Sequence, residues 1–253
     1  MISGDSDLSA IGALLSEPAR ALILLALSDG RALPASMLAS EARVSPSTAS
    51  EHLRRLVAGG LLTVSVHGRY RYYRLAGPQV ADLLEAIERL APTRQVTSLR
   101  EGTKAHAIRL ARRCYDHIGG RLGVALTGAF LREGYLAGHD GSVDFGRMTG
   151  DRPAGGVLDP IAYTLTAEGA QAFTSIGAQP PRNPAVRCCV DWTEQRHHMA
   201  GAAGRELLNR MLDLGWVQPS RHHRALSITD TGHEQLAERF GILPDELSAP
   251  RAA

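Results

Sequence analysis

The stretch "RVSPSTASEHLRRLVAGG", residues 43–60, predicts one short helix that is apolar on one side and polar on the other. Ser45 suits the N-cap and Pro46 suits the first helical position, whereas Gly59 and Gly60 end the helix. Apolar residues between these signals recur at the spacing of one helix face, which must pack against a core. They are Ala49, Leu53, Leu56 and Val57.

The opposite face of this helix is polar, with Ser50 and His52 on its flanks. Taken alone, such a helix usually just faces solvent, so its neighbours decide whether it binds something. Upstream, residues 33–44 predict a second short helix with Leu38 and Ala42 turned inward. A helix, a tight turn and a second helix capped by serine is typical of a helix-turn-helix. The side chains that point outward from the second helix are Ser47, Thr48, Glu51, Arg54 and Arg55.

Downstream, residues 61–76 predict a β-hairpin with a basic second strand. Apolar residues alternate in the first strand, the pattern breaks at His67-Gly68, and tyrosines then alternate with arginines. A helix-turn-helix followed by a basic hairpin is a winged helix. In this arrangement the second helix enters the DNA major groove, and the hairpin reaches the backbone or the minor groove beside it.

The local charge supports a nucleic-acid partner, although the whole chain carries a formal net charge of only +2. Residues 43–74 contain several arginines against a single acidic residue, Glu51. A basic stripe on the elements expected to touch DNA is what phosphate neutralisation requires. The arginines are Arg43, Arg54, Arg55, Arg69, Arg71 and Arg74.

The segments "LSEPARALILLALSDG", "SPSTASEHLRRLVAGGLL" and "HGRYRYYRLA" resemble the ArsR/SmtB family of winged helix-turn-helix repressors, over about residues 6–90. The resemblance implies a bacterial homodimer that sits on a palindromic operator of double-stranded DNA and leaves it when an effector binds. By the match of positions, base edges would be read by Ser47, Thr48, Ser50, Glu51 and His52. Phosphates would be held by Arg54, Arg55, Arg69 and Arg71, and Ser45 and His67 complete the expected DNA-binding set.

Two segments predict a dimer interface. Residues 77–92 form an apolar helical stripe longer than a small domain needs for its own core. The family resemblance implies that an N-terminal helix completes this surface. Two recognition helices related by a two-fold axis would then meet half-sites about 34 Å apart. The residues expected at the interface are Leu8, Ile11, Leu14, Val80, Leu83, Leu84, Ile87 and Leu90.

The chain departs from the metal-sensing members of the family. Those members often carry Cys-x-Cys in the first helix of the helix-turn-helix, and residues 33–44 contain no cysteine. Others use Asp and His ligands on the dimer helix, and residues 77–92 contain no histidine. We therefore expect the effector to act elsewhere in the chain.

Length and composition predict a globular protein with more than one domain. The 253 residues are more than twice what one winged helix needs, 44% are hydrophobic and 21% are charged. No apolar run approaches a membrane span, and the first residues lack the pattern of a secretory signal, so we expect a cytoplasmic protein without a membrane partner. Three cysteines, an odd number, argue against a disulfide framework.

The second half of the chain contains an internal repeat. Residues 117–136 align with 198–217 at a constant offset, and residues 163–173 correspond to 226–236, each with a Thr-x-x-Gly turn that opens a helix. We therefore expect two degenerate winged-helix-like copies after the DNA-binding domain. The fold class is mainly α with small β-hairpins (α+β), and the expected domains are 1–95, 96–181 and 182–253.

Each copy opens with cysteine and histidine, and all three cysteines of the chain lie at these two corresponding places. Three interpretations stay open: ordinary packing, a pocket for a small organic effector between the copies, or a metal, arsenical or thiol-redox sensor. Among the sensing roles we favour the organic effector, and no cofactor is firmly indicated. The candidate residues are Cys114, Tyr115, His117, Cys188, Cys189, Asp191, Trp192, His197 and His198.

An enzyme is disfavoured because the sequence lacks a Gly-x-Gly-x-x-Gly, a phosphate loop, a His-Glu-x-x-His and a Gly-x-Ser-x-Gly. A DNA-binding architectural protein without an effector remains an alternative, and it predicts no ligand-dependent change in operator affinity. The sequence thus predicts a DNA-binding transcriptional regulator, a repressor, whose C-terminal region senses an effector.

Overall fold

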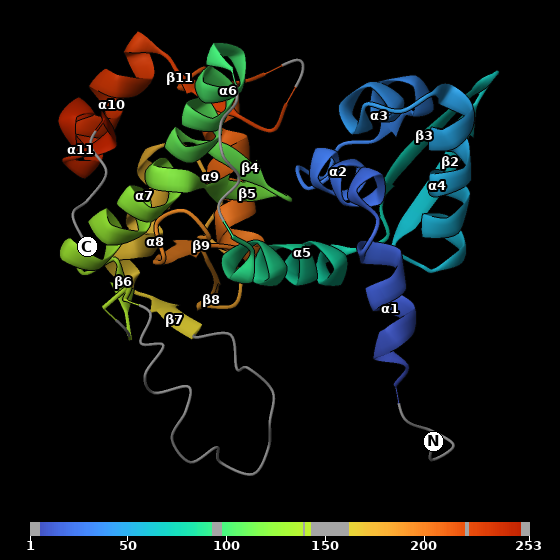
Figure 1. Cartoon of the computed structure of the whole chain (residues 1–253). Helices are drawn as coiled ribbons and strands as arrows, with labels where there is room; N and C mark the ends of the chain where they lie inside the picture. Colours follow the sequence, from blue (N-terminus) through green and yellow to red (C-terminus); the bar gives the residue numbers. More distant parts are fainter. Residues whose placement is uncertain (1–5, 93–97, 139, 143–161, 221–222, 249–253) are drawn as a thin grey trace. The chain divides into compact units, whose positions relative to one another are not determined.

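The computed structural model describes residues 6–92, 98–138, 140–142, 162–220 and 223–248 (Figure 1). Its contacts divide the chain into two compact units, Met1–Leu84 and Glu85–Ala253, which are described separately. The division falls inside helix α5 (Pro78–Leu90), about ten residues before the boundary expected at 95. The reason is that Glu85 and Glu88, on the second half of α5, lie in ion-pair range of arginines that belong to the C-terminal unit.

The first unit is a winged helix-turn-helix. Its strands form one antiparallel sheet in the order β1-β3-β2, so the wing hairpin β2-β3 is extended by the short strand that precedes the helix-turn-helix. This confirms the fold expected for the N-terminal region. Besides the start of α5, the elements are α1 (Leu8–Leu15), α2 (Pro18–Ala26), β1 (Leu33–Pro34), α3 (Ala35–Ala42), α4 (Pro46–Ala58), β2 (Leu62–His67) and β3 (Tyr70–Leu75).

Local signals fix the ends of α4, and its apolar stripe fixes its packing. The Ser45 side chain accepts a hydrogen bond from the Thr48 backbone amide, and Arg43 ends α3 in the left-handed region at φ 57°. Ala49, Leu53 and Leu56 are fully buried, as predicted. They contact helices α2 and α3, whose own buried residues include Ile23, Leu24 and Leu38.

No single helix in the described part of the chain is long and apolar enough to cross a membrane. Helices α1 and α2 satisfy the length and composition only as a pair, and they are bent by 88° at the break between them.

The second unit contains the two sequence repeats, and both copies have the element order β-β-α-β-β-α. Helix α6 (Leu99–Leu110) precedes the first copy and α11 (Pro244–Ser248) follows the second. The first copy consists of β4 (Arg112–Cys114), β5 (His117–Gly119), α7 (Gly120–Arg132), β6 (Leu136–Ala137), β7 (Ala162–Leu165) and α8 (Ala167–Ser175). The second consists of β8 (Ala185–Val190), β9 (His197–Met199), α9 (Gly201–Asp213), β10 (Val217–Pro219), β11 (Leu226–Ile228) and α10 (Asp230–Phe240).

The two copies share a β-sheet and do not form separate domains. The last hairpin of the first copy pairs with the first hairpin of the second, which gives the antiparallel sheet β6-β7-β8-β9. The reverse combination occurs where β4 meets β11: Arg112 bridges to Ala225, and the Arg113 amide donates to the Arg224 carbonyl at 2.8 Å. The predicted ranges 96–181 and 182–253 therefore mark sequence repeats within one compact unit.

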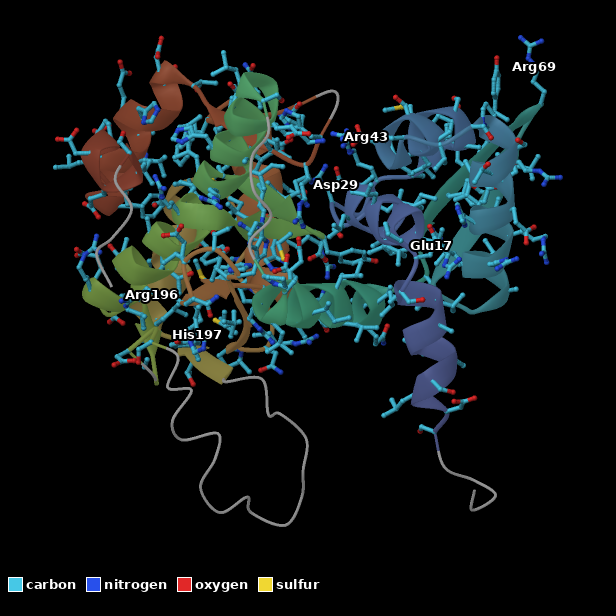
Figure 2. All side chains as sticks on the ribbon, viewed as in Figure 1. Glu17, Asp29, Arg43, Arg69, Arg196 and His197 are labelled. Atoms are coloured by element: carbon cyan, nitrogen blue, oxygen red, sulfur yellow. The ribbon has the colours of Figure 1, made fainter. Side chains whose placement is uncertain are left out.

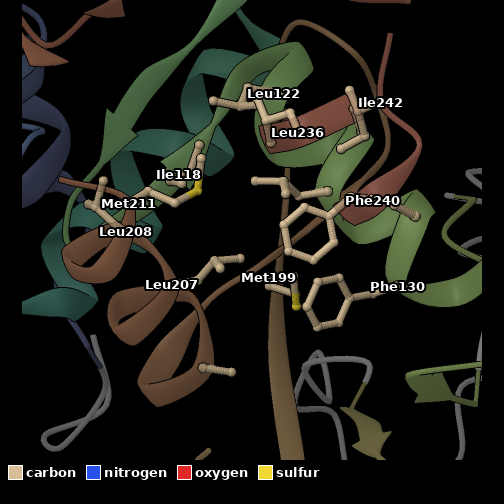
Figure 3. Packing of buried hydrophobic residues seen from close by; sticks show 14 of the residues in the cluster. Ile118, Leu122, Phe130, Met199, Leu207, Leu208, Met211, Leu236, Phe240 and Ile242 are labelled. Carbon is tan, nitrogen blue, oxygen red and sulfur yellow. The ribbon is translucent and has the colours of Figure 1, made fainter. Parts of the chain in front are cut away.

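One hydrophobic core serves both copies (Figure 3). Phe130 of α7 stacks on Phe240 of α10 with ring centroids 5.6 Å apart and meets Phe173 of α8 edge to face at 5.7 Å. Leu122 and Leu236 are fully buried in the same cluster. Because the core mixes side chains from both repeats, neither repeat has a complete core of its own.

Two glycines let each long helix approach the first hairpin of the opposite copy. A Cβ at Gly204 of α9 would lie 2.9 Å from His117 Cβ and would clash with the Met199 carbonyl. A Cβ at Gly123 of α7 would lie 3.3 Å from His198 Cβ and would clash with the Ile118 carbonyl. The equivalent positions of the repeat thus carry the same steric constraint.

We expect Gly123→Ala and Gly204→Ala each to lower the free energy of unfolding by about 1–3 kcal/mol, because the added methyl group overpacks a closed contact. Gly128→Ala is the matched control on α7, since its Cβ would meet only the Arg132 side chain, at 3.6 Å. That change should stabilise the helix by up to about 1 kcal/mol. Urea unfolding of the three variants measures the difference, and equal stabilities would contradict the close approach.

Candidate functional site

The outer face of α4 presents a row of hydroxyl groups. Ser45, Ser47, Thr48 and Ser50 are exposed, and His52 is half-buried. The Ser45 hydroxyl lies 2.9 Å from the Ser47 hydroxyl and 2.8 Å from the Thr48 hydroxyl. The Ser50 hydroxyl donates to the Pro46 carbonyl at 2.8 Å. These hydrogen bonds hold the short polar side chains against the first turns of the helix, so they do not project far from its surface.

Glu51 ties two arginines to the same helix face. Arg54 donates to both carboxylate oxygens, at 2.9 and 2.7 Å, and Arg55 donates to Oε1 at 2.7 Å. The hydrogen bonds from Arg54 and then Arg55 lower the pKa of Glu51 to about 2. The carboxylate is therefore ionised at any physiological pH, and the exposed cluster carries two positive charges against one negative charge.

The wing carries the other predicted DNA-binding residues. Strands β2 and β3 are joined by a two-residue turn, Gly68-Arg69, in which Gly68 adopts φ 60°. His67, Arg69 and Arg71 are exposed on this hairpin, and the Arg69 guanidinium lies 5.3 Å from the Tyr70 ring centre. Figure 2 shows Arg69 at the tip of the wing.

A groove of about 990 Å³ runs between α4, the start of α3 and the wing. Residues from both predicted DNA-contacting elements line it, so the fold brings the two elements to one surface. The lining residues include Ser47, Ser50, Glu51, Arg54, Arg69 and Arg71.

The expected dimer residues are exposed to different degrees. Helix α1 has no buried residue, and Leu8 is 80% exposed. On α5, Leu90 is 87% exposed and Ile87 is 39% exposed, whereas Leu84 is buried. The half-buried ones are Ile11, Leu14, Val80 and Leu83.

In the second unit, four of the predicted effector residues form one compact cluster, the cysteine-histidine cluster: Cys114, His117, Cys189 and His198. One potential ligand atom from each lies within 4.8 Å of the other three. Cys114 is opposite His117 on β4-β5, and Cys189 is opposite His198 on β8-β9. Cross-strand partners face the same side of a hairpin, so each repeat contributes one thiol and one imidazole as a pair.

An aspartate accompanies each histidine of the cluster. Asp116 Oδ1 lies 3.1 Å from His117 Nδ1, and Asp191 Oδ2 lies 3.4 Å from His198 Nδ1. The opposite ring nitrogens, Nε2 of both histidines, are buried and have no hydrogen-bond partner among the described residues. Asp191 also accepts from Arg112 at 2.9 Å and from the Gly120 amide at 2.7 Å, so its position is fixed.

Burial and neighbouring charges set the protonation of the cluster. Burial lowers the pKa of His198 to about 3, against the attraction of the Asp191 carboxylate, so this imidazole is neutral. A hydrogen bond with Cys189, burial and the charge of Glu85 hold the pKa of Cys114 well above its usual range. The Cys114 thiol donates to Glu85 Oε1 at 3.2 Å.

Against the effect of burial, the charge of Cys114 and the hydrogen bond with Asp116 raise the pKa of His117 to about 10. The neutral His198 imidazole is ready to bind a cation, whereas the Cys114 thiol and the His117 ring must each lose a proton to do so.

The remaining effector candidates lie outside the cluster. Cys188 pairs with Met199 across the strands, so it faces the opposite side of the sheet from Cys189. The Tyr163 hydroxyl lies 2.6 Å from His197 Nδ1. Trp192 lies under the Arg112 guanidinium at 5.0 Å, and Tyr115, at φ 57°, forms the β4-β5 turn.

Sequence reasoning did not single out Glu85 and Arg112, which are both buried beside the cluster. Arg112 Nη2 lies 3.9 Å from Glu85 Oε2, and no local motif marks either residue. A signal was present for the aspartates, because Cys114-x-Asp116 and Cys189-x-Asp191 repeat the same spacing.

The cavity where the long helices meet the first hairpins of the two copies is too small for an organic effector. Between β5, α7, β9 and α9 there is a cavity of only about 10 Å³, lined by Ile118, Gly123, Leu126, Met199, Gly204 and Leu207. This volume holds at most about one water molecule. The organic pocket between the copies stays a prediction, but this contact does not provide it.

Comparison with known proteins places these features among transcriptional regulators. A family described as "Helix-turn-helix domain" matches residues 15–65. An uncharacterized HTH-type transcriptional regulator of Bacillus subtilis, YdfF, is 37% identical over 231 residues, which cover 89% of this chain and 93% of the relative.

Solved structures match the N-terminal region. The homodimeric winged helix-turn-helix DNA-binding domain of a possible ArsR-family transcriptional regulator from Mycobacterium bovis is 28% identical and covers 38% of this chain and 100% of its own, with a TM-score of 0.30. HlyU from Vibrio cholerae is 26% identical and covers 36% and 97%, with a TM-score of 0.33. By its helix-turn-helix domain and its similarity to YdfF along nearly the whole chain, this protein belongs to the HTH-type transcriptional regulators.

Proposed function

We propose that the protein is a homodimeric repressor of the ArsR type that binds a palindromic operator and is released by an effector sensed in its C-terminal unit. The observation that carries this proposal is the single surface formed by α4 and the wing. There, exposed hydroxyl groups and arginines from both elements line one groove. Short hydroxyl side chains suit base edges, and arginines suit phosphates.

The Glu51 cluster gives this surface a way to discriminate between DNA sequences. In free protein the carboxylate holds Arg54 and Arg55 on the helix face. On DNA the same carboxylate repels phosphates and accepts hydrogen bonds only from a donor such as the cytosine amino group. Glu51 therefore disfavours non-specific binding, while the two arginines add affinity.

The apolar surface of α1 supports a homodimer. An eight-residue helix with no buried residue is too short to be stable in water without a packing partner. Arg20 ties α1 to the first unit by donating to the carbonyls of Ala13 and Leu14, both at 2.6 Å. The exposed Leu8 is therefore held in a fixed position, where a second copy of the chain can cover it.

The C-terminal unit supplies the sensor in this proposal. No cysteine occurs in α3 and no histidine in α5, so this chain lacks both metal sites that the metal-sensing members of the family use. The second unit instead holds every cysteine of the chain and the buried cysteine-histidine cluster. An effector there needs to favour one state of the regulator by only about 1–3 kcal/mol to control release.

We expect Arg55→Ala to weaken binding to DNA from upstream of the protein's own gene and to reduce the slope of log K against log salt by about 1, because one phosphate contact is lost. Arg239→Ala, an exposed arginine on α10, is the matched control and should leave the slope unchanged. Fluorescence anisotropy over a salt series measures both. If the two variants behave alike, α4 is not the DNA-binding helix.

Glu51→Gln should raise the affinity for unrelated DNA more than the affinity for the operator, because it removes a negative charge and releases two arginines. Glu234→Gln, an exposed change on α10, controls for net charge. Competition binding with operator and random duplexes gives the ratio of the two affinities. An unchanged ratio for Glu51→Gln would rule out the discriminating role.

The double change Leu8→Asp with Ile11→Asp should shift the chain from dimer to monomer, because it places charges in an apolar contact. Ala13→Asp lies on the opposite side of α1 and serves as the control. Sedimentation velocity at several protein concentrations resolves the two species. A dimer that withstands the double change would exclude α1 from the interface.

A further inference from the structure

The cysteine-histidine cluster has the geometry of a four-coordinate cation site. Its four donor atoms lie within 4.8 Å of one another. Even a regular tetrahedron with that edge has its centre only about 2.9 Å from each corner. Zinc requires about 2.3 Å to sulfur and about 2.0 Å to nitrogen, so each donor has to move by less than about 1 Å.

Two buried nitrogen atoms without hydrogen-bond partners favour a bound ligand within the cysteine-histidine cluster. Nε2 of His117 and Nε2 of His198 have no partner among the described residues, and an unsatisfied buried polar atom costs about 1–3 kcal/mol. A carboxylate lies near Nδ1 of each ring: Asp116 at hydrogen-bond distance from His117, 3.1 Å, and Asp191 within ion-pair range of His198, at 3.4 Å. A carboxylate at the far nitrogen is the usual support for a metal-binding histidine, because it orients the ring and raises its basicity.

The charges also fit a divalent ion. Two thiolates neutralise one dication, so the filled centre is neutral and its burial carries no net-charge penalty. Each supporting aspartate has its own counter-charge: Asp191 pairs with Arg112 at 2.9 Å, and Asp116 pairs with Arg205 at 2.8 Å. Binding converts the two thiols to thiolates and the His117 ring to its neutral form, and the protons that these groups lose go to solvent.

We propose that Cys114, His117, Cys189 and His198 bind one transition-metal ion of the zinc class and that this ion is the effector of the regulator, a role that rests on the proposed function. Two sulfur and two nitrogen donors in a closed tetrahedral set select Zn²⁺ over hard cations such as Mg²⁺ or Ca²⁺. The ligands come half from each repeat, so the ion joins β4-β5 to β8-β9.

The contact between Cys114 and Glu85 connects the cysteine-histidine cluster to helix α5. In the described state the thiol donates to the Glu85 carboxylate, which α5 carries. A metal-bound thiolate has no proton to donate, so this contact cannot persist when the site is filled. Helix α5 begins in the first unit at Pro78 and ends in the second at Leu90, so a change at Glu85 acts on the segment that links them.

Cobalt titration of the full-length reduced protein tests the site directly. We expect one Co²⁺ per chain, with the thiolate-to-cobalt charge transfer and the visible bands of a tetrahedral ion, and displacement of both by Zn²⁺. Cys114→Ser and Cys189→Ser should each lose the charge-transfer intensity. Cys188→Ser is the matched control, because it removes a neighbouring thiol that lies outside the cluster. Circular dichroism checks that the variants are folded.

Wild-type protein that binds no stoichiometric Co²⁺ would overturn the proposal, whatever the variants do. So would a Cys188→Ser variant that loses the spectrum while a folded Cys189→Ser variant keeps it. These readouts do not depend on DNA binding, so they test the site independently of the proposed function.

Operator binding with and without Zn²⁺ tests the effector role. We expect zinc to change the affinity of wild type and Cys188→Ser by at least about fivefold and to leave Cys189→Ser unchanged. Metal binding with equal operator affinity in both states would overturn the effector role and leave the repressor standing. Metal binding without any specific DNA binding would instead overturn the proposed function and leave the metal site standing.

Discussion

The C-terminal unit depends on the close approach of each long helix to the first hairpin of the opposite repeat. Gly123 and Gly204 make that approach possible, and the atoms that they face are the Cβ atoms of His198 and His117. The same contacts that build the shared core therefore bring the two histidines together, with ring centres 5.1 Å apart. The cysteine-histidine cluster is a consequence of how the repeats pack, because neither repeat alone provides more than two of its four residues.

This arrangement also explains why the cluster is polar inside an otherwise apolar unit. Arg112 is fully buried, and it is held there by Asp191 and lies near Glu85. Such a buried network is costly unless its members are paired, and here the arginine and both aspartates are paired. The Nε2 atoms of both histidines have no hydrogen-bond partner among the described residues, as is also true of His198 Nδ1, Arg112 Nε and Glu85 Oε2. A cation in the cluster would bind the two Nε2 atoms.

Local sequence signals predicted the first unit well and the second only in part. The Ser45 cap, the buried stripe at Ala49, Leu53 and Leu56, and the break at Gly68 depend on neighbouring residues, so a single sequence reveals them. The internal repeat was also visible, since equivalent glycines and Thr-x-x-Gly turns recur at fixed spacing. The pairing of hairpins from different copies was not visible in the sequence, because strand pairing between residues far apart in the chain leaves no local pattern.

The same limit applies to the candidate sites. The candidate effector residues contained all four members of the cluster, but the sequence did not distinguish Cys189 from its neighbour Cys188. Adjacent residues of a strand face opposite sides of the sheet, so the side chain of Cys188 points away from the cluster. Glu85 was missed because its partners, Cys114 and Arg224, are far along the chain. The preference for an organic effector came from expecting a cavity between the copies, and the cavity between β5, α7, β9 and α9 measures only about 10 Å³.

The measurement that tests the coupling most directly is the zinc affinity of the full-length protein with and without its operator, determined by competition against a chelator. If zinc binding and DNA binding are linked, the operator must change the zinc dissociation constant by the same factor by which zinc changes the operator affinity. If zinc is the releasing effector, as we propose, bound operator weakens zinc binding at least about fivefold. Equal zinc affinities in the two states would contradict the claim that the cysteine-histidine cluster controls the DNA-binding unit.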